Sequence, residues 1–155
     1  MKISFSKPPI YDEAARAFEI PDDRVTYFTY GDTCFIPKGG GISDDLKVHE
    51  QTHMVQQEHS DEVAKEWWKE YLADPEFRFH QEAEAYAVQW KYLCRGIKDR
   101  NAKFRVLWNI AIQLSSGMYG HCCTHTEAMK MIRKYAAGVM HPKGVPKVGE
   151  NVVKS

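Results

Sequence analysis

The amino-acid sequence predicts an α+β fold in which a small N-terminal antiparallel sheet packs on a mostly helical remainder. Two observations predict it. β-Branched and aromatic residues with turn signals are concentrated before Gly41, and helix start and stop signals follow one another after it. With 155 residues, of which 43% are hydrophobic and 27% charged, the chain has an ordinary globular composition. We expect one domain over residues 1–140, followed by an extended tail over 141–155 that has little to pack.

The first 40 residues are expected to supply the sheet. Residues 2–6 favour a short strand, and residues 11–18 favour a helix. Residues 25–30 and 33–37 are rich in β-branched and aromatic side chains, and the turn signal Gly31-Asp32 separates them. This pattern is typical of a β-hairpin with a tight turn.

Five helices are expected after a flexible glycine-rich break at residues 38–41. Carboxylates in a first turn favour a helix start after Ser43, and Asp74-Pro75 should stop the second helix. Thr124 and Glu127 have the spacing of a capping box at the start of the fifth. The expected ranges are 43–59, 60–72, 77–95, 102–115 and 124–137.

Composition also narrows the classes of function. Lys and Arg together number 21, as do Asp and Glu, so affinity for nucleic acid or for an anionic membrane would need a local patch. The most apolar stretch, residues 106–114, is interrupted by Asn109 and Gln113, and no membrane span is expected. The N-terminus lacks a signal-peptide pattern, and the four cysteines are expected to be free thiols. We therefore expect a cytoplasmic protein without a nucleic-acid partner.

The most informative string is HEQTH at residues 49–53, an H-E-x-x-H motif. Residues four apart share a helix face, so the imidazoles of His49 and His53 can reach one zinc ion. Glu50 lies about 100° around the helix, where it can act on a metal-bound water. The alternative is a pair of surface histidines on a polar helix.

A helical wheel weighs against surface histidines. It places one apolar side of the helix beside the histidines and a mostly solvated side opposite. The apolar side comprises Val48, Thr52 and Val55. The solvated side comprises Lys47, Gln51, Met54 and Glu58. The histidines fall between the two sides, as residues that line a cleft should.

A zinc site needs a third protein ligand, and the segment around residues 79–86 offers two glutamates. Glu82 shares a face with Ala85 and Tyr86, where an unpaired carboxylate would be costly, so a metal is a natural partner for it. Glu84 points about 200° away and is expected to be solvated. The alternatives are Glu84 as the ligand, or no ligand from this helix.

This arrangement of motifs resembles the gluzincin metallopeptidases, particularly their short members. The resemblance implies a zincin-like helical domain, His49, His53 and Glu82 as zinc ligands, and Glu50 as general base. Many gluzincins place an aspartate four residues after the ligand glutamate to orient a ligand histidine. This chain has Tyr86 there.

A longer pattern over residues 25–135 is similar to small peptidase-like proteins encoded by tailed bacteriophages. It adds several residues to the zinc motif, namely Gln56, Gln57, Trp67, Trp68, Tyr71, Phe77, Arg78 and the segment 114–120 with Glu127-Ala128. The resemblance implies a polypeptide substrate or phage virion proteins as partners, with synthesis in the host cytoplasm.

Several residues remain open as stabilisers of a transition state or as supports of the ligands. The candidates are Tyr71, His80, Tyr86 and Tyr119. A second metal cluster in the segment His121-Cys122-Cys123-Thr124-His125 is disfavoured, because adjacent cysteines ligate one tetrahedral ion poorly.

Two hypotheses follow. The first is a zinc metallopeptidase in which Glu50 takes the proton of a zinc-activated water. The second is a virion structural component of the neck, tail or interior that keeps a zinc-stabilised fold with little or no catalysis. An intact Glu50 favours the first, because a purely structural site has no need of a carboxylate that is not a ligand.

Overall fold

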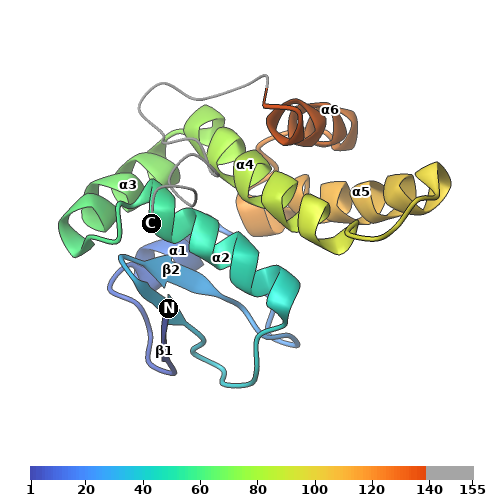
Figure 1. Ribbon diagram of the computed structural model, residues 1–155. Helices are drawn as coiled ribbons and strands as arrows, with labels where there is room; N and C mark the ends of the chain where they lie inside the picture. The colour runs from blue at the N-terminus through green and yellow to red at the C-terminus, as the bar shows by residue number, and fades with distance from the viewer. Residues whose placement is uncertain (139–155) are drawn as a thin grey trace.

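The computed structural model describes residues 1–138, and the tail expected over 141–155 lies outside them. The described chain is α+β, as predicted, with a small sheet at its N-terminal end and helices over the rest (Figure 1). Its elements are β1 (Lys2–Ser4), α1 (Tyr11–Ala17), β2 (Phe28–Tyr30), β3 (Thr33–Phe35), α2 (Asp44–Gln56), α3 (Asp61–Ala73), α4 (Pro75–Leu93), α5 (Arg100–Leu114), the 3₁₀ turn η1 (Gly117–Tyr119) and α6 (His125–Ala136). None of the helices described is both long and apolar enough to span a membrane.

The sheet has the strand order β1-β3-β2 and is mixed. The predicted hairpin is confirmed, since β2 and β3 pair antiparallel with Thr29 opposite Cys34. The expectation of a wholly antiparallel sheet was wrong for β1, which pairs parallel with β3. The chain passes through α1 between β1 and the hairpin, so no tight turn fixes the direction of β1, and a strand of three residues carries too little pattern to reveal it.

Two helices hold the hairpin in place. The backbone N–H of Gly31 donates to Oε1 of Gln57 at 2.8 Å, and Nε2 of Gln57 donates to the carbonyl of Thr29 at 3.1 Å. The indole N–H of Trp68 on α3 donates to the same carbonyl at 2.8 Å. Strands this short would not pair stably alone. These three bonds therefore fix Thr29 and Gly31 of the hairpin against α3 and the C-terminal end of α2.

The boundary between α3 and α4 is a single residue. Asp74 ends α3, and its carboxylate accepts a hydrogen bond from the backbone N–H of Glu76 at 2.9 Å. Pro75 then occupies the first position of α4, where its missing N–H costs nothing. The predicted stop is confirmed, but α4 begins two residues earlier than expected because the same Asp-Pro pair also starts a helix.

The capping box at the start of α6 is confirmed. The hydroxyl of Thr124 accepts from the backbone N–H of Glu127 at 3.2 Å, and the Glu127 carboxylate accepts from the backbone N–H of Thr124 at 2.8 Å. Both bonds satisfy donors that a helix N-terminus leaves unpaired.

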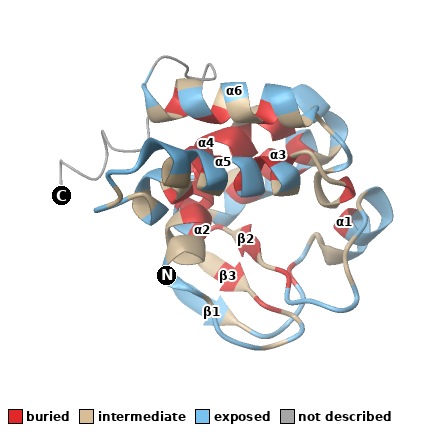
Figure 2. Cartoon of the chain, turned by 90° about the vertical axis from the view of Figure 1, so that its right-hand side faces the viewer, coloured by how far each residue is buried: buried red, intermediate tan, exposed pale blue. Residues whose placement is uncertain are grey.

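Buried residues lie on the inward sides of the helices and of the sheet (Figure 2), and the apolar ones form three clusters. The largest joins α4, α5 and α6, and the second joins α1, β2 and α3. The third joins Cys34 and Ile36 to Met54 of α2. The predicted solvated position of Met54 was therefore wrong, because the hairpin covers that side of α2. Thr52 is buried as expected, whereas Val48 and Val55 are only half-buried.

The burial of Met54 gives a prediction about stability. Met54→Ala removes a side chain that is 1% exposed and should lower the free energy of unfolding by about 2–4 kcal/mol. Gln51→Ala, an exposed change on the same helix, should alter it by about 0.5 kcal/mol or less. Urea unfolding of both variants measures the difference, and equal losses would contradict the packing of the hairpin on α2.

Candidate metal centre

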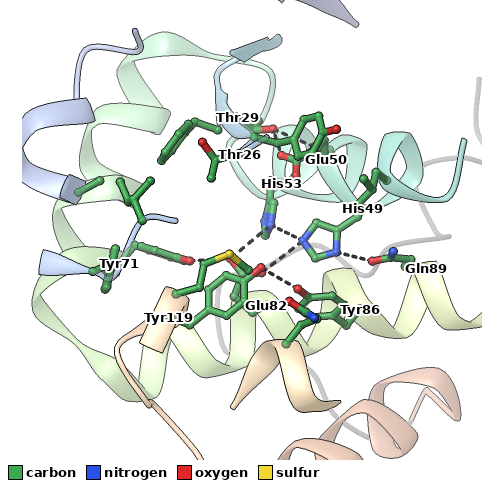
Figure 3. A pocket seen from close by; sticks show the side chains of 18 of the residues that line it. Thr26, Thr29, His49, Glu50, His53, Tyr71, Glu82, Tyr86, Gln89 and Tyr119 are labelled. Carbon is green, nitrogen blue, oxygen red and sulfur yellow. Dashed lines mark hydrogen bonds and ion pairs between the residues drawn. The ribbon is translucent and has the colours of Figure 1, made fainter. Parts of the chain in front are cut away.

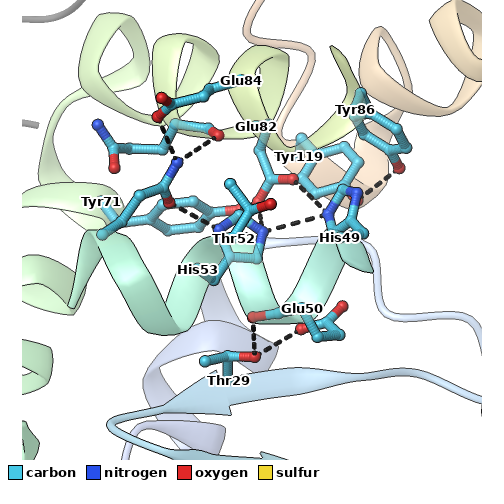
Figure 4. A network of polar contacts seen from close by, with 12 residues as sticks. Thr29, His49, Glu50, Thr52, His53, Tyr71, Glu82, Glu84, Tyr86 and Tyr119 are labelled. Carbon is cyan, nitrogen blue, oxygen red and sulfur yellow. Dashed lines mark hydrogen bonds and ion pairs between the residues drawn. The ribbon is translucent and has the colours of Figure 1, made fainter. Parts of the chain in front are cut away.

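Packing of α2 on α4 brings His49, His53 and Glu82 together (Figure 4). One nitrogen of each ring and one carboxylate oxygen lie within 4.8 Å of one another. Nε2 of His49 lies 3.2 Å from Nε2 of His53 and 3.3 Å from Oε2 of Glu82, and Nε2 of His53 lies 3.5 Å from Oε1. All three residues are 5% exposed or less. These residues could hold a metal ion.

The tautomer of His53 is set by Gln56. Nδ1 of His53 lies 2.8 Å from Oε1 of Gln56, an oxygen that can only accept. The orientation of this amide is fixed in turn, because Nε2 of Gln56 donates to the carbonyl of Gln81 and to the Glu84 carboxylate, each at 3.0 Å. Nδ1 of His53 must therefore carry a hydrogen, and the lone pair of a neutral ring lies on Nε2.

His49 is held in the same way by Gln89. Nδ1 of His49 lies 3.0 Å from Oε1 of Gln89, and Nε2 of Gln89 donates to Oδ2 of Asp45 at 2.8 Å. A carboxylate only accepts, so the Gln89 amide cannot be reversed without loss of that bond. In both histidines, Nε2 is thus the nitrogen that faces Glu82.

The donor set fits a divalent cation. In their neutral forms, two imidazole nitrogens and a carboxylate converge with lone pairs toward one point. Oε2 of Glu82 is buried and accepts no hydrogen bond from any residue within 1–138. Two histidines and one carboxylate form a common protein ligand set of catalytic zinc. Each histidine also donates its other N–H to an oxygen, as metal-binding histidines nearly always do.

The charges of Glu82 and His53 shift each other's pKa in opposite directions. Burial alone would raise the pKa of Glu82, but the two imidazoles, His53 foremost, hold it well below its ordinary value. Burial alone would lower the pKa of His53, but the Glu82 carboxylate outweighs it and raises that pKa to about 9. Without a metal, a proton supplies the positive charge that the buried carboxylate needs.

Tyr71 supports Glu82 from α3. Its hydroxyl donates to Oε1 of Glu82 at 2.6 Å, and burial together with the Glu82 charge raises the pKa of this phenol well above its usual value. The hydrogen of Tyr71 is therefore committed to the carboxylate. Of the residues left open by the sequence, Tyr71 is the one whose hydroxyl orients a candidate ligand, Glu82.

Glu84 is not the solvated residue expected from the wheel. It is 3% exposed, and its carboxylate accepts from Gln56. The prediction for Glu84 assumed that this helix has a single packed face. In the structure, α4 has α2 on one side and α6 on another. Glu84 therefore lies behind His53, and Gln56 links the two.

Glu50 lies on the side of the histidines that faces the sheet (Figure 3). The hydroxyl of Thr29 in β2 donates to Oε2 of Glu50 at 2.7 Å. Glu50 is 6% exposed and lines the same cavity as His49, His53 and Glu82. The hairpin thus fixes the carboxylate that the sequence predicts as general base.

Tyr86 and Tyr119 lie on the opposite side of the histidines, and their hydroxyl oxygens are 2.7 Å apart. The ring of Tyr86 packs edge-on against His49 with centroids 4.4 Å apart, but the bond to Nδ1 comes from Gln89. Gln89, and not Tyr86, therefore orients the ring of His49. Burial and the Glu82 charge raise the pKa of both phenols, and the hydrogen bond with Tyr119 opposes the rise in the pKa of Tyr86.

His80 lies away from these residues. Its Nδ1 is 2.7 Å from the Tyr135 hydroxyl on α6, and its Nε2 is 3.3 Å from the Glu76 carboxylate. It does not line the cavity. The segment 121–125 also forms no metal cluster within residues 1–138, since Cys122 and Cys123 approach the carbonyl of Leu114 and His125 contacts the carbonyl of Trp108.

The three candidate ligands line one wall of a cavity of about 410 Å³. Its other walls are largely apolar and come from α1, α3, α5, η1 and the segment before β2. The apolar lining includes Phe18, Ile20, Val25, Phe28, Trp68, Ile110 and Met118. A small molecule or an extended chain of a few residues can therefore reach the ligands.

Sequence reasoning missed Thr29, Asp45 and Gln89 as parts of this site. Gln56 and Gln89 did fall on the ligand-bearing faces of their helices. Polar residues there are a signal for partners of the ligands, because a buried amide must be hydrogen-bonded.

The ligand assignment predicts metal content. The purified protein should hold about one zinc ion per chain. His49→Ala and Glu82→Ala should each lose most of it, because two donors seldom hold zinc. Elemental analysis after dialysis measures the content, with Glu66→Ala on the surface of α3 as a control. Full zinc content in Glu82→Ala would refute the assignment.

The support of His49 predicts a weaker effect at Gln89. Gln89→Leu keeps all three ligands but removes the acceptor that orients His49, so zinc affinity should fall about 10- to 100-fold. Asp45 is half-exposed and can turn to water, so the variant should still fold. Competition with a chelator dye measures the affinity, with Gln51→Ala as control. Wild-type affinity in Gln89→Leu would show that His49 needs no such support.

Comparison with known proteins provides no further guide to this site. No protein-family model, no curated protein and no solved structure matches the chain. The case for a metal centre therefore rests on the distances, burial and hydrogen bonds of the residues themselves.

Proposed function

We propose that this protein is a zinc-dependent hydrolase that cleaves peptide bonds. One observation carries the proposal, namely that the triad of His49, His53 and Glu82 lines the same cavity as Glu50. Structural zinc sites are closed by four protein ligands, whereas catalytic sites keep a position open. Three protein ligands beside a cavity match the catalytic kind.

Zinc is the metal we favour because the donors are two imidazoles and one carboxylate in a buried site. When bound, zinc polarises a carbonyl group and lowers the pKa of a water molecule. The protein then has to supply a proton acceptor, a hydrogen-bond donor for the developing negative oxygen, and a place for the substrate.

Glu50 is the proton acceptor in this proposal. The Thr29 hydroxyl occupies its Oε2, which fixes the carboxylate and leaves Oε1 to receive a proton from water. Glu50 would then pass that proton to the leaving amine. A carboxylate at this position has no part in the ligand set, so its burial against Thr29 supports a chemical role.

The Tyr86–Tyr119 pair is the hydrogen-bond donor for the developing negative oxygen in this proposal. The two hydroxyl groups carry two hydrogens, and their mutual bond uses one of them. The other can donate to the oxygen of a substrate carbonyl as negative charge develops on it. Because the pKa of each phenol is raised, both remain protonated near neutral pH.

The peptide bond as substrate comes from the resemblance to gluzincins and to phage-encoded peptidase-like proteins. The second candidate, a zinc-stabilised virion component with little catalysis, would use the same ligands. The cavity beside the triad supports the hydrolase, because a site that only stabilises the fold has no use for an opening of this size.

The decisive variant is Glu50→Gln. The amide oxygen can still accept from Thr29, so fold and zinc content should be unchanged, while the loss of the base should slow hydrolysis about 10²- to 10⁴-fold. Unfolded casein and mixed dye-quenched peptides are suitable substrates. Glu66→Gln, an exposed change on α3, should be as active as wild type.

Two results would count against the hydrolase. Equal cleavage by wild type and Glu50→Gln would assign the activity to a contaminant or to another group. A zinc-loaded wild type that is inert on every substrate would favour the structural role.

A further inference from the structure

The outward face of α5 is apolar where a surface helix should be polar. Phe104, Trp108 and Ile112 lie on successive turns of one face and are 42%, 47% and 48% exposed. We call these three residues the α5 stripe. The helix contains no aspartate or glutamate. The opposite side of α5 is ordinary core, with Leu107, Ala111 and Leu114 fully buried.

The charges of the chain are segregated, although they cancel overall. Residues 1–94 contain ten Lys or Arg and eighteen Asp or Glu. Residues 95–138 contain eight Lys or Arg and two Asp or Glu. The positive segment comprises α5, α6 and the loop before α5. Its cations are Arg95, Lys98, Arg100, Lys103, Arg105, Lys130, Arg133 and Lys134, of which six are exposed and two half-buried.

Cations adjoin the stripe directly. The guanidinium carbon of Arg133 on α6 lies 5.8 Å from the centroid of the Phe104 ring, and exposed Arg105 follows Phe104 in the chain. Both acidic residues of the positive segment already have partners. Asp99 caps α5 and lies 4.0 Å from Arg105, and Glu127 closes the capping box of α6.

The size of the stripe limits what can bind it. A large apolar side chain carries roughly 150–250 Å² of surface, so the exposed fractions leave roughly 300 Å² on the stripe. A stable protein–protein interface needs about 800 Å² on each partner. A lipid surface needs no matching shape, and each nearby cation strengthens binding to anionic lipid roughly five-fold.

We propose that the α5 stripe and its surrounding cations form a docking surface for an anionic phospholipid membrane. Phe104, Trp108 and Ile112 enter the boundary between headgroups and acyl chains, as the apolar face of an interfacial helix does. The arginines and lysines remain at the level of the lipid phosphates. This docking is peripheral and is independent of the proposed hydrolase activity.

The position of α5 connects the docking surface to the metal centre. Asn109, Ile110 and Gln113 of the same helix line the cavity beside the triad. A membrane bound along α5 would therefore hold the cavity close to the lipid surface.

Vesicle sedimentation tests the proposal with the full-length protein. The probes are vesicles of phosphatidylcholine alone and of phosphatidylcholine with one-third phosphatidylglycerol. Wild type should bind the anionic vesicles about ten-fold or more tightly, with binding reduced by salt and a blue shift of tryptophan emission. Trp108→Ser should weaken binding about ten-fold and abolish most of the shift, and Arg100→Glu/Arg105→Glu should weaken it at least as much.

The matched control is Lys65→Glu/Lys69→Glu on α3, which makes the same charge change at two exposed positions outside the positive segment. It should bind within about two-fold of wild type. Ile112→Ser provides a second stripe variant should Trp108→Ser melt early, as checked by circular dichroism.

Several results would overturn the proposal. Equal binding to neutral and anionic vesicles, or none to either, would exclude an anionic lipid surface. Unchanged binding by Trp108→Ser would exclude insertion of the stripe. A concentration-dependent dimer that Trp108→Ser abolishes, seen by light scattering, would identify a second copy as the occupant. Tighter binding to duplex DNA than to vesicles would identify nucleic acid.

Discussion

The burial of one carboxylate between α2 and α4 is the constraint on which the site depends. Glu82 is 3% exposed, and an unpaired charge at such a position would cost several kcal/mol. Tyr71 and the two histidines surround it, and two glutamines fix the histidines from behind. This set of bonds leaves two imidazole nitrogens and one carboxylate oxygen converging on one point. Such a group attracts positive charge, which either a proton or a metal ion can supply.

The small sheet completes the site although it holds few residues. Three-residue strands depend on the helices for their stability, and the bonds from Gln57 and Trp68 to the Thr29 carbonyl provide the attachment. The side chain of the same threonine holds Glu50. Thr29 therefore both anchors the hairpin and positions the proposed general base.

The central position of α4 explains why so many of its polar residues are buried. Neighbouring helices cover it on several sides, and Arg78, Gln81, Glu82, Glu84 and Gln89 are each 6% exposed or less. A helix with polar residues buried on several sides needs hydrogen-bond partners on each of them. In contrast, α5 has one face in the core and another that exposes apolar side chains, a distribution that core packing alone does not explain.

The sequence by itself determined the α+β class, the hairpin, the five helices after Gly41, and the candidate ligands. These features depend on local signals such as turn residues, caps and the four-residue spacing of His49 and His53, which a helix converts directly into proximity. Glu82 could also be chosen over Glu84, because one helix face was visibly more apolar than the other. Only the tertiary structure decided the pairing of β1, the burial of Met54 and Glu84, and the links from Gln89 to His49 and from Thr29 to Glu50. Each of these depends on which element covers a given face, and contacts between residues 21 to 44 positions apart leave no periodic trace in one sequence.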